Sequence, residues 1–175
     1  GALVDQHHRP SGVERLPALY ATLTTQDDFP VTLKETLIRR WLLSAVAAAF
    51  MSGGFSARGV LVLQGRQSLG KTRWIIALVP AGMMREAFLK MDHLLDPNTK
   101  DSVLGAIRSW ICELGELDAS FNRADLGRIK GFITNGLDVI RAPYGRVDIK
   151  YQRRTVFAAT VNHTEFLIDD TGNTR

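Results

Sequence analysis

The residues most suited to chemistry lie in one short stretch, Gly65-Arg66-Gln67-Ser68-Leu69-Gly70-Lys71-Thr72. Its spacing, G-x-x-x-x-G-K-[ST], is typical of loops that hold the phosphates of a nucleotide. Glycines let backbone N–H groups turn toward a phosphate, and the start of a following helix adds a partial positive charge. Lys71 would contact the β- and γ-phosphates, and the Thr72 hydroxyl would hold Mg²⁺. The stretch predicts a nucleoside triphosphate site, and an ordinary glycine-rich connection is the alternative.

The expected ligands are therefore ATP and Mg²⁺. An apolar run over residues 59–64 precedes the loop and a helical pattern over residues 73–78 follows it, which is the strand and helix context that the motif requires. The residues expected to contact the nucleotide are Gly65, Gln67, Ser68, Leu69, Gly70, Lys71, Thr72 and Arg73.

Hydrolysis needs further groups, namely an acid that orders Mg²⁺ and water, a polar sensor of the γ-phosphate and a positive charge. Glu113 closes an apolar run, so we expect it beside the loop in a parallel sheet, as a second metal ligand. Glu116 is a candidate for the base that polarises water, or else an exposed loop acid. Asn162 ends a later apolar run and could bond the γ-phosphate or simply terminate a strand.

Alternating strands and helices must position these side chains. Patterns predict strands over residues 59–64, 86–90, 109–114 and 155–161, and helices over 73–78, 100–107 and 122–133. Residues 139–151 predict a β-hairpin around Pro143-Tyr144-Gly145, and residues 13–50 predict two helices, of which the second packs beneath the sheet. These elements indicate an α/β fold with a parallel sheet core flanked by helices, in which ligands bind at the carboxyl ends of the strands.

Length and composition are those of an ordinary globular protein. We expect residues 1–57 to form an N-terminal arm and helical segment, and residues 58–175 to form the core. The single cysteine, Cys112, excludes an internal disulfide framework and lies in an apolar run, as expected of a buried side chain. The apolar run after Arg39-Arg40 is too short to span a membrane, so we expect an intracellular protein.

Positive charge is concentrated near the C-terminal third of the chain. Eight Lys or Arg accompany three Asp between residues 123 and 154, in a chain whose net charge is +4. This segment is a candidate surface for a polyanion, and a solvated face is the alternative.

Taken together, the motifs resemble those of the virulence-associated protein E family of phages, prophages and plasmids. The resemblance extends from about Pro30 to the last residue, through the phosphate-binding loop, residues 110–117 and 130–134, the Tyr144-Gly145-Arg146 segment, the Thr160-Val161-Asn162 strand end and residues 166–175. That family is similar to superfamily 3 helicases of the AAA+ class. The resemblance therefore implies a P-loop NTPase with an inserted β-hairpin.

The activity that this resemblance implies is that of an ATP-dependent DNA motor, the helicase module of a mobile-element replication protein in the cytoplasm of a bacterial host. Lys71 and Thr72 match the Walker A residues, Glu113 the Walker B acid and Asn162 sensor 1, with Glu116 as a candidate catalytic acid. Arg175 is the candidate arginine finger that acts on the ATP of a neighbouring subunit in a homo-oligomeric ring, expected to be a hexamer.

The expected DNA contact is the hairpin. Its candidate residues are Lys130, Arg141, Tyr144, Arg146 and Lys150, with Tyr144 suited to stacking on bases of single-stranded or forked DNA. Arg153 and Arg154 are also basic, but could instead pair locally with acids or reach the γ-phosphate of a neighbouring subunit.

Two departures from the family pattern leave assignments open. Relatives often have two adjacent acids where Leu114 follows Glu113 here, so the base could be Glu113 or Glu116. Thr174 stands where the family usually has an arginine, and we expect the chain to be the core of a longer protein. The alternative function is a nucleotide-dependent DNA-binding switch or scaffold without unwinding activity. The basic hairpin argues against a third class, a small-molecule kinase.

Overall fold

The computed structural model describes residues 14–115, 123–141 and 147–162. The chain divides into two compact units, Gly1–Arg39 and Arg40–Arg175. The first contains helix α1 (Leu16–Ala21), which has a proline in its first turn, and the beginning of helix α2 (Val31–Phe50). Within this unit, the Lys34 ammonium donates a 2.9 Å hydrogen bond to the carbonyl of Leu23. Among the described residues, no helix is both long and apolar enough to cross a membrane.

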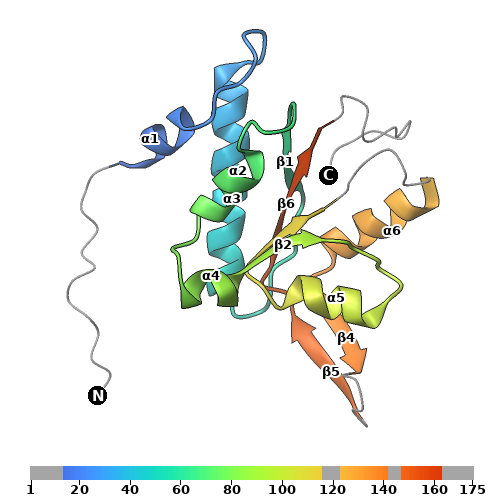
Figure 1. The fold of residues 1–175 in the computed structure, drawn as a ribbon. Coiled ribbons are helices and arrows are strands. Elements are labelled where there is room, and N and C mark those ends of the chain that lie inside the picture. The colour runs from blue at the N-terminus through green and yellow to red at the C-terminus, as the bar shows by residue number, and fades with distance from the viewer. Residues whose placement is uncertain (1–13, 116–122, 142–146, 163–175) are drawn as a thin grey trace, which may run out of the picture. The chain divides into compact units, whose positions relative to one another are not determined.

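The second unit is built on a four-stranded parallel sheet (Figure 1). Its strands are β1 (Val60–Gln64), β2 (Leu89–His93), β3 (Ile111–Leu114) and β6 (Val156–Val161), in the order β1-β6-β3-β2. Every neighbouring pair is parallel. The mixed α/β fold with a parallel sheet flanked by helices, predicted from the alternation of elements, is confirmed.

One predicted strand is misplaced. Residues 86–88 belong to helix α4 (Met83–Phe88), and β2 begins only at Leu89. Phe88 lies in the predicted strand but is exposed in the structure, whereas Leu89 and His93 point into the protein. Apolar composition over a short window therefore did not identify the buried residues.

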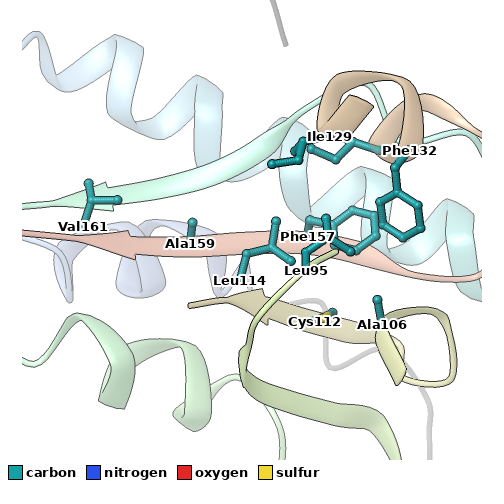
Figure 2. Close-up of a cluster of buried hydrophobic side chains, with 10 residues drawn as sticks. Leu95, Ala106, Cys112, Leu114, Ile129, Phe132, Phe157, Ala159 and Val161 are labelled. Atoms are coloured by element: carbon teal, nitrogen blue, oxygen red, sulfur yellow. The ribbon is translucent and has the colours of Figure 1, made fainter. Parts of the chain in front are cut away.

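Helices cover both faces of the sheet, because its strands place alternate side chains on opposite faces. On one face, Cys112, Phe157 and Ala159 pack with side chains of α5 (Lys100–Ile107) and α6 (Arg123–Thr134), as Figure 2 shows. On the other face, strand residues pack with Ile75 of α3 (Lys71–Ala77) and with Trp41 of α2. The predicted helix over 100–107 is confirmed, and α6 begins and ends one residue later than predicted.

Two tryptophans fix the second half of α2 to the sheet. The indole N–H of Trp41 donates a 2.7 Å hydrogen bond to the carbonyl of Phe157, and that of Trp110 donates a 2.8 Å bond to the carbonyl of Ala45. Each buried indole thus has a hydrogen-bond partner, as such groups require. The predicted packing of this helix against the sheet is confirmed.

A separate hairpin consists of β4 (Leu137–Arg141) and β5 (Asp148–Gln152), which pair antiparallel. Figure 1 shows the hairpin beyond the start of β6, at the end of the sheet opposite to the carboxyl ends of the strands. The apolar residues that suggested this strand are not its buried face: Val147 and Ile149 are 72% and 47% exposed. Asp138 and Ile140 of β4 are buried instead.

Candidate nucleotide-binding site

The phosphate-binding motif forms the connection between β1 and α3. Gly65 has φ 155°, Ser68 has φ 67° and Gly70 has φ 83°, so the loop uses three positive φ angles in six residues. Glycine adopts these angles without steric cost. At Gly70 a Cβ would meet no neighbouring atom, so its backbone conformation, rather than lack of space, favours glycine there. The side chains of residues 66–70 are exposed, which leaves the loop accessible to a ligand.

Lys71 is the first residue of α3, and its side chain folds back over the loop. Its ammonium donates hydrogen bonds of 2.6 Å to the carbonyl of Gly65 and 2.7 Å to that of Arg66. A third bond, of 3.0 Å, goes to the Oδ1 atom of Asn162. All three donor positions of the ammonium group are thus used. They join both ends of the loop to Asn162, which follows β6.

The end of β6 is joined to the loop by the backbone as well. The N–H of Gly65 donates a 3.1 Å hydrogen bond to the carbonyl of Val161, which extends the β1–β6 ladder by one step into the loop. Asn162 directly follows Val161 and is exposed. A residue 91 positions after Lys71 in sequence is therefore held at the edge of the loop.

Glu113 lies within β3 and is 3% exposed. Its Oε1 atom accepts a 2.8 Å hydrogen bond from the hydroxyl of Thr160 on β6. Its Oε2 atom accepts a 2.8 Å bond from the backbone N–H of Asp92 on β2. Both oxygens of this buried carboxylate are thus satisfied by the two neighbouring strands, which is what burial of a charged group requires.

The strand order shows how Glu113 lies relative to the loop. β6 lies between β1 and β3, so two strand spacings separate the strand of Glu113 from β1. The expectation that Glu113 lies beside the loop as a metal ligand stays a prediction. Thr160 occupies the intervening strand. The hydrogen bond from Thr160 connects the Glu113 carboxylate to β6, the strand that lies next to β1.

These polar groups share one face of the sheet. Ile111 of β3 packs on the α3 side, and Glu113 is two residues further along, so it projects to the same side. By the same alternation Thr160 follows Ala158, which also packs on the α3 side. The acid and Thr160 therefore lie on the face that carries α3, whose first residue is Lys71.

The end of β2 is shaped around Glu113. Asp92 has φ 51°, an uncommon angle for a residue with a side chain, and the β2–β3 register shifts between Lys90 and His93. A Cβ on Gly115 would come within 2.3 Å of the Asp92 carboxylate and 3.3 Å of its backbone. Glycine at position 115 therefore leaves room for the side chain of Asp92, whose backbone N–H donates to Glu113.

The sequence named Thr160 only as part of the Thr160-Val161-Asn162 strand end, without a role of its own, and did not single out Asp92. A signal for Thr160 was present, because it precedes Asn162 by two positions and a strand alternates with period two. Asp92 contributes a backbone N–H, which no side-chain pattern reveals.

The other predicted residues are distributed as follows. Glu116, Tyr144, Arg146 and Arg175 lie outside the described residues. Arg141 and Lys150 are exposed on the hairpin, and Lys130 is half-buried on α6. Thr72, Gln67, Ser68, Leu69 and Arg73 are exposed in or next to the loop.

Two basic residues near the hairpin have local partners. Arg153 is fully buried, and its guanidinium donates to both carboxylate oxygens of Asp138 at 2.7 Å and to the carbonyl of Phe132. Burial lowers the pKa of Arg153, and the bonds to Asp138 oppose that shift. Arg154 donates a 3.0 Å hydrogen bond to the carbonyl of Ala49. Arg153 and Arg154 therefore bond groups of this chain, as the alternative to a DNA contact stated for them.

Cys112 is fully buried on the face opposite to Glu113, and burial raises the pKa of its thiol to about 12. It is therefore a neutral core side chain at physiological pH, as its apolar surroundings in the sequence predicted. A cavity of about 660 Å³ lies elsewhere, between α5, α6 and β4, with Lys100, Asn135 and Asp138 in its lining. It is not near the loop and takes no part in the candidate site.

Comparison with known proteins gives a family and a fold. A profile of the family described as "Virulence-associated protein E-like domain" matches residues 5–175. The apo structure of the NrS-1 C-terminal region (305-718) superposes with a TM-score of 0.57 at 21% identity, covering 91% of this chain and 36% of that one. The A form apo structure of the same region gives 0.55 at 19% identity, covering 91% and 35%. This chain thus spans about a third of the length of those chains. A search of curated proteins found no match.

Proposed function

Since the chain belongs to the virulence-associated protein E-like domain family, we propose that it is an ATP-dependent motor on DNA, the helicase module of a phage or mobile-element replication protein. Its core would be a P-loop NTPase of the AAA+ type, which hydrolyses ATP between the subunits of a ring. The observation that carries this proposal is the shared edge of the sheet, where the loop, Lys71, Asn162 and the bridge from Thr160 to Glu113 converge.

The loop residues fit a triphosphate with Mg²⁺. The loop is exposed, and the Thr72 hydroxyl lies in the first turn of α3, where the motif places a metal ligand. Among the described residues, no three His, Cys, Asp or Glu side chains gather as a metal site. The phosphates and water would therefore supply most Mg²⁺ ligands, as is usual for this ion. Bound Mg²⁺ would neutralise charge that develops on the phosphates.

Lys71 and Asn162 would exchange partners when a nucleotide binds. The phosphate oxygens would compete for the ammonium of Lys71 with its three present acceptors, the two loop carbonyls and Asn162. A phosphate is the stronger acceptor because it is charged. Asn162 would then be released to orient the γ-phosphate or the attacking water, the role proposed for it from sequence. Glu113 or Glu116 would order that water.

The hairpin is the proposed DNA contact. In an antiparallel pair, residues opposite each other share a face, so Arg141 and Lys150 lie on one exposed face of the hairpin, together with Val139 and with Asp148, which pairs with Arg141. The hairpin leads into β6 through Arg153, and β6 ends at Val161, directly before Asn162. One strand thus connects the proposed DNA contact to the proposed nucleotide site, although they lie at opposite ends of the sheet.

The decisive experiment is an ATPase assay with and without single-stranded DNA. We expect the parent protein to hydrolyse ATP in the presence of Mg²⁺ and to be stimulated by DNA. Lys71→Ala should lower turnover at least about a hundredfold, because it removes the charge that stabilises the transferred phosphoryl group. Lys90→Ala, which removes an exposed lysine of β2, is the matched control and should leave turnover unchanged.

A second function has a specific observation in its favour. Both oxygens of Glu113 are bonded to protein, which suits a nucleotide-dependent switch or scaffold that binds ATP and DNA without unwinding. Tight ATP binding that is lost in Lys71→Ala, together with no turnover at any DNA concentration, would support the switch and contradict the motor.

A further inference from the structure

Thr160 and Asn162, two residues apart near the end of β6, bond two different side chains. Asn162 accepts from Lys71 at 3.0 Å, and two residues earlier Thr160 donates to Glu113 at 2.8 Å. The N–H of Asp92 continues the line to β2. These polar contacts follow the strand order across the sheet. They begin at Lys71, which follows the loop after β1, continue through β6 and β3, and end at Asp92 in β2.

Of the two groups that bond the Glu113 carboxylate, the Thr160 hydroxyl is the one that belongs to a side chain. The carboxylate of a glutamate rotates freely about its last bond unless hydrogen bonds hold it. The Asp92 N–H fixes one oxygen, and the Thr160 hydroxyl fixes the other. With both bonds made, the carboxylate plane and its remaining lone pairs have one orientation, set by the strand that also carries Asn162.

We propose that Thr160 is a positioning residue, which holds Glu113 in register with Asn162 so that acid and sensor act on the same phosphate. This inference rests on the proposed ATPase function and adds to it a residue that acts through Glu113 rather than on substrate. Preorganised groups accelerate a reaction because their orientation is set before the transition state forms, and small misplacements are costly.

The test uses valine and serine at position 160. Thr160→Val keeps the branched shape but removes the hydroxyl, whereas Thr160→Ser keeps the hydroxyl. The matched control is Thr155→Val. Thr155 is also buried, just before β6, and its hydroxyl bonds the carbonyls of Ile107 and Ser109 at 3.1 and 2.6 Å, far along the strand from Glu113. Both valine variants lose a hydroxyl hydrogen bond from the same segment, so their thermal stabilities calibrate the structural cost.

We expect Thr160→Val to lower kcat at least about tenfold, with ATP affinity within about twofold of the parent, because an interaction used in the chemical step affects kcat rather than binding. Thr160→Ser should retain most of the activity, and Thr155→Val should lose stability but keep kcat. If Thr160→Val does not fold, Thr160→Ala replaces it, because alanine puts no methyl group where the hydroxyl was.

Three outcomes overturn the proposal: Thr160→Val with the parent's kcat, Thr160→Ser as inactive as Thr160→Val, or Thr155→Val with the same loss of kcat. In each of these the parent still hydrolyses ATP, so the proposed function stands while the role of Thr160 falls. A parent protein without turnover overturns both.

Discussion

At the scale of single residues, two arginine–aspartate pairs of the hairpin region differ in burial. The pair Arg153–Asp138 has side chains that are 0% and 7% exposed, and its guanidinium lies 4.1 Å from the ring centroid of Phe132. The pair Arg141–Asp148, at 3.3 Å, has side chains that are 53% and 57% exposed. Water screens the second pair but not the first, so only the first should matter for folding.

Asp138→Asn should therefore destabilise the protein by about 3 kcal/mol or more, because it leaves the Arg153 guanidinium buried without a charged partner. Asp148→Ala, the matched change at the exposed pair, should cost less than about 1 kcal/mol. Urea denaturation followed by circular dichroism measures both. Adding Arg153→Met to Asp138→Asn should recover part of the loss, since the buried charge is then gone. Equal losses in the two single variants would contradict this account.

At the scale of elements, the hairpin has an exposed face that carries Arg141 and Lys150, on which Asp148 pairs with Arg141. If this face binds single-stranded DNA, Lys150→Ala should weaken binding several-fold. It should also reduce the slope of log affinity against log salt by about 0.7, the value for one lost phosphate contact on a single strand. Fluorescence anisotropy with a labelled oligonucleotide over a salt series provides the measurement.

Lys90→Ala serves as the control for this series as well, because it removes one positive charge from a strand of the main sheet. An effect of Lys90→Ala as large as that of Lys150→Ala would mean that net charge, and not the hairpin, determines affinity. Unchanged affinity in Lys150→Ala would remove this residue from the proposed contact.

The same scale shows which elements were predictable from sequence. β1, β3 and β6 are short apolar runs next to turn residues, and local patterns located them within about two residues. β2 was misplaced because the exposed Phe88 resembles a core residue, while the buried His93 does not. The strand order depends on contacts between distant segments, which no local pattern contains, and this order determines the distance of Glu113 from the loop.

Prediction of the site had the same limit. Lys71 could be singled out by the spacing of the glycine-rich motif, and Glu113 and Asn162 because each follows or ends a recognisable apolar run. Thr160 was recognised only as part of the strand-end motif with Asn162, and its partner Glu113 could not be known from sequence. The N–H that reaches Glu113 belongs to Asp92, whose positive φ angle only the folded chain reveals.

At the scale of the whole molecule, the proposed ring requires that each site be completed by a neighbour. Lys71 belongs to the subunit that binds the nucleotide, whereas Arg175, which lies outside the described residues, is proposed to act on the nucleotide of the next subunit. An interface of this head-to-tail kind joins two different surfaces of the same chain. Lys71→Ala and Arg175→Ala should therefore each abolish turnover while damaging opposite sides of the interface.

Mixing the two inactive variants tests this arrangement directly. A site formed by Lys71 of the Arg175→Ala subunit and Arg175 of the Lys71→Ala subunit is intact, and random head-to-tail assembly at equal concentrations should make about a quarter of all sites of this kind. We expect ATPase activity to reappear on mixing and to rise with total protein concentration, because the active site forms only on association. Each variant alone at the same total concentration is the control. A mixture as inactive as its components would place Arg175 on the same subunit as the nucleotide it serves, or outside the site.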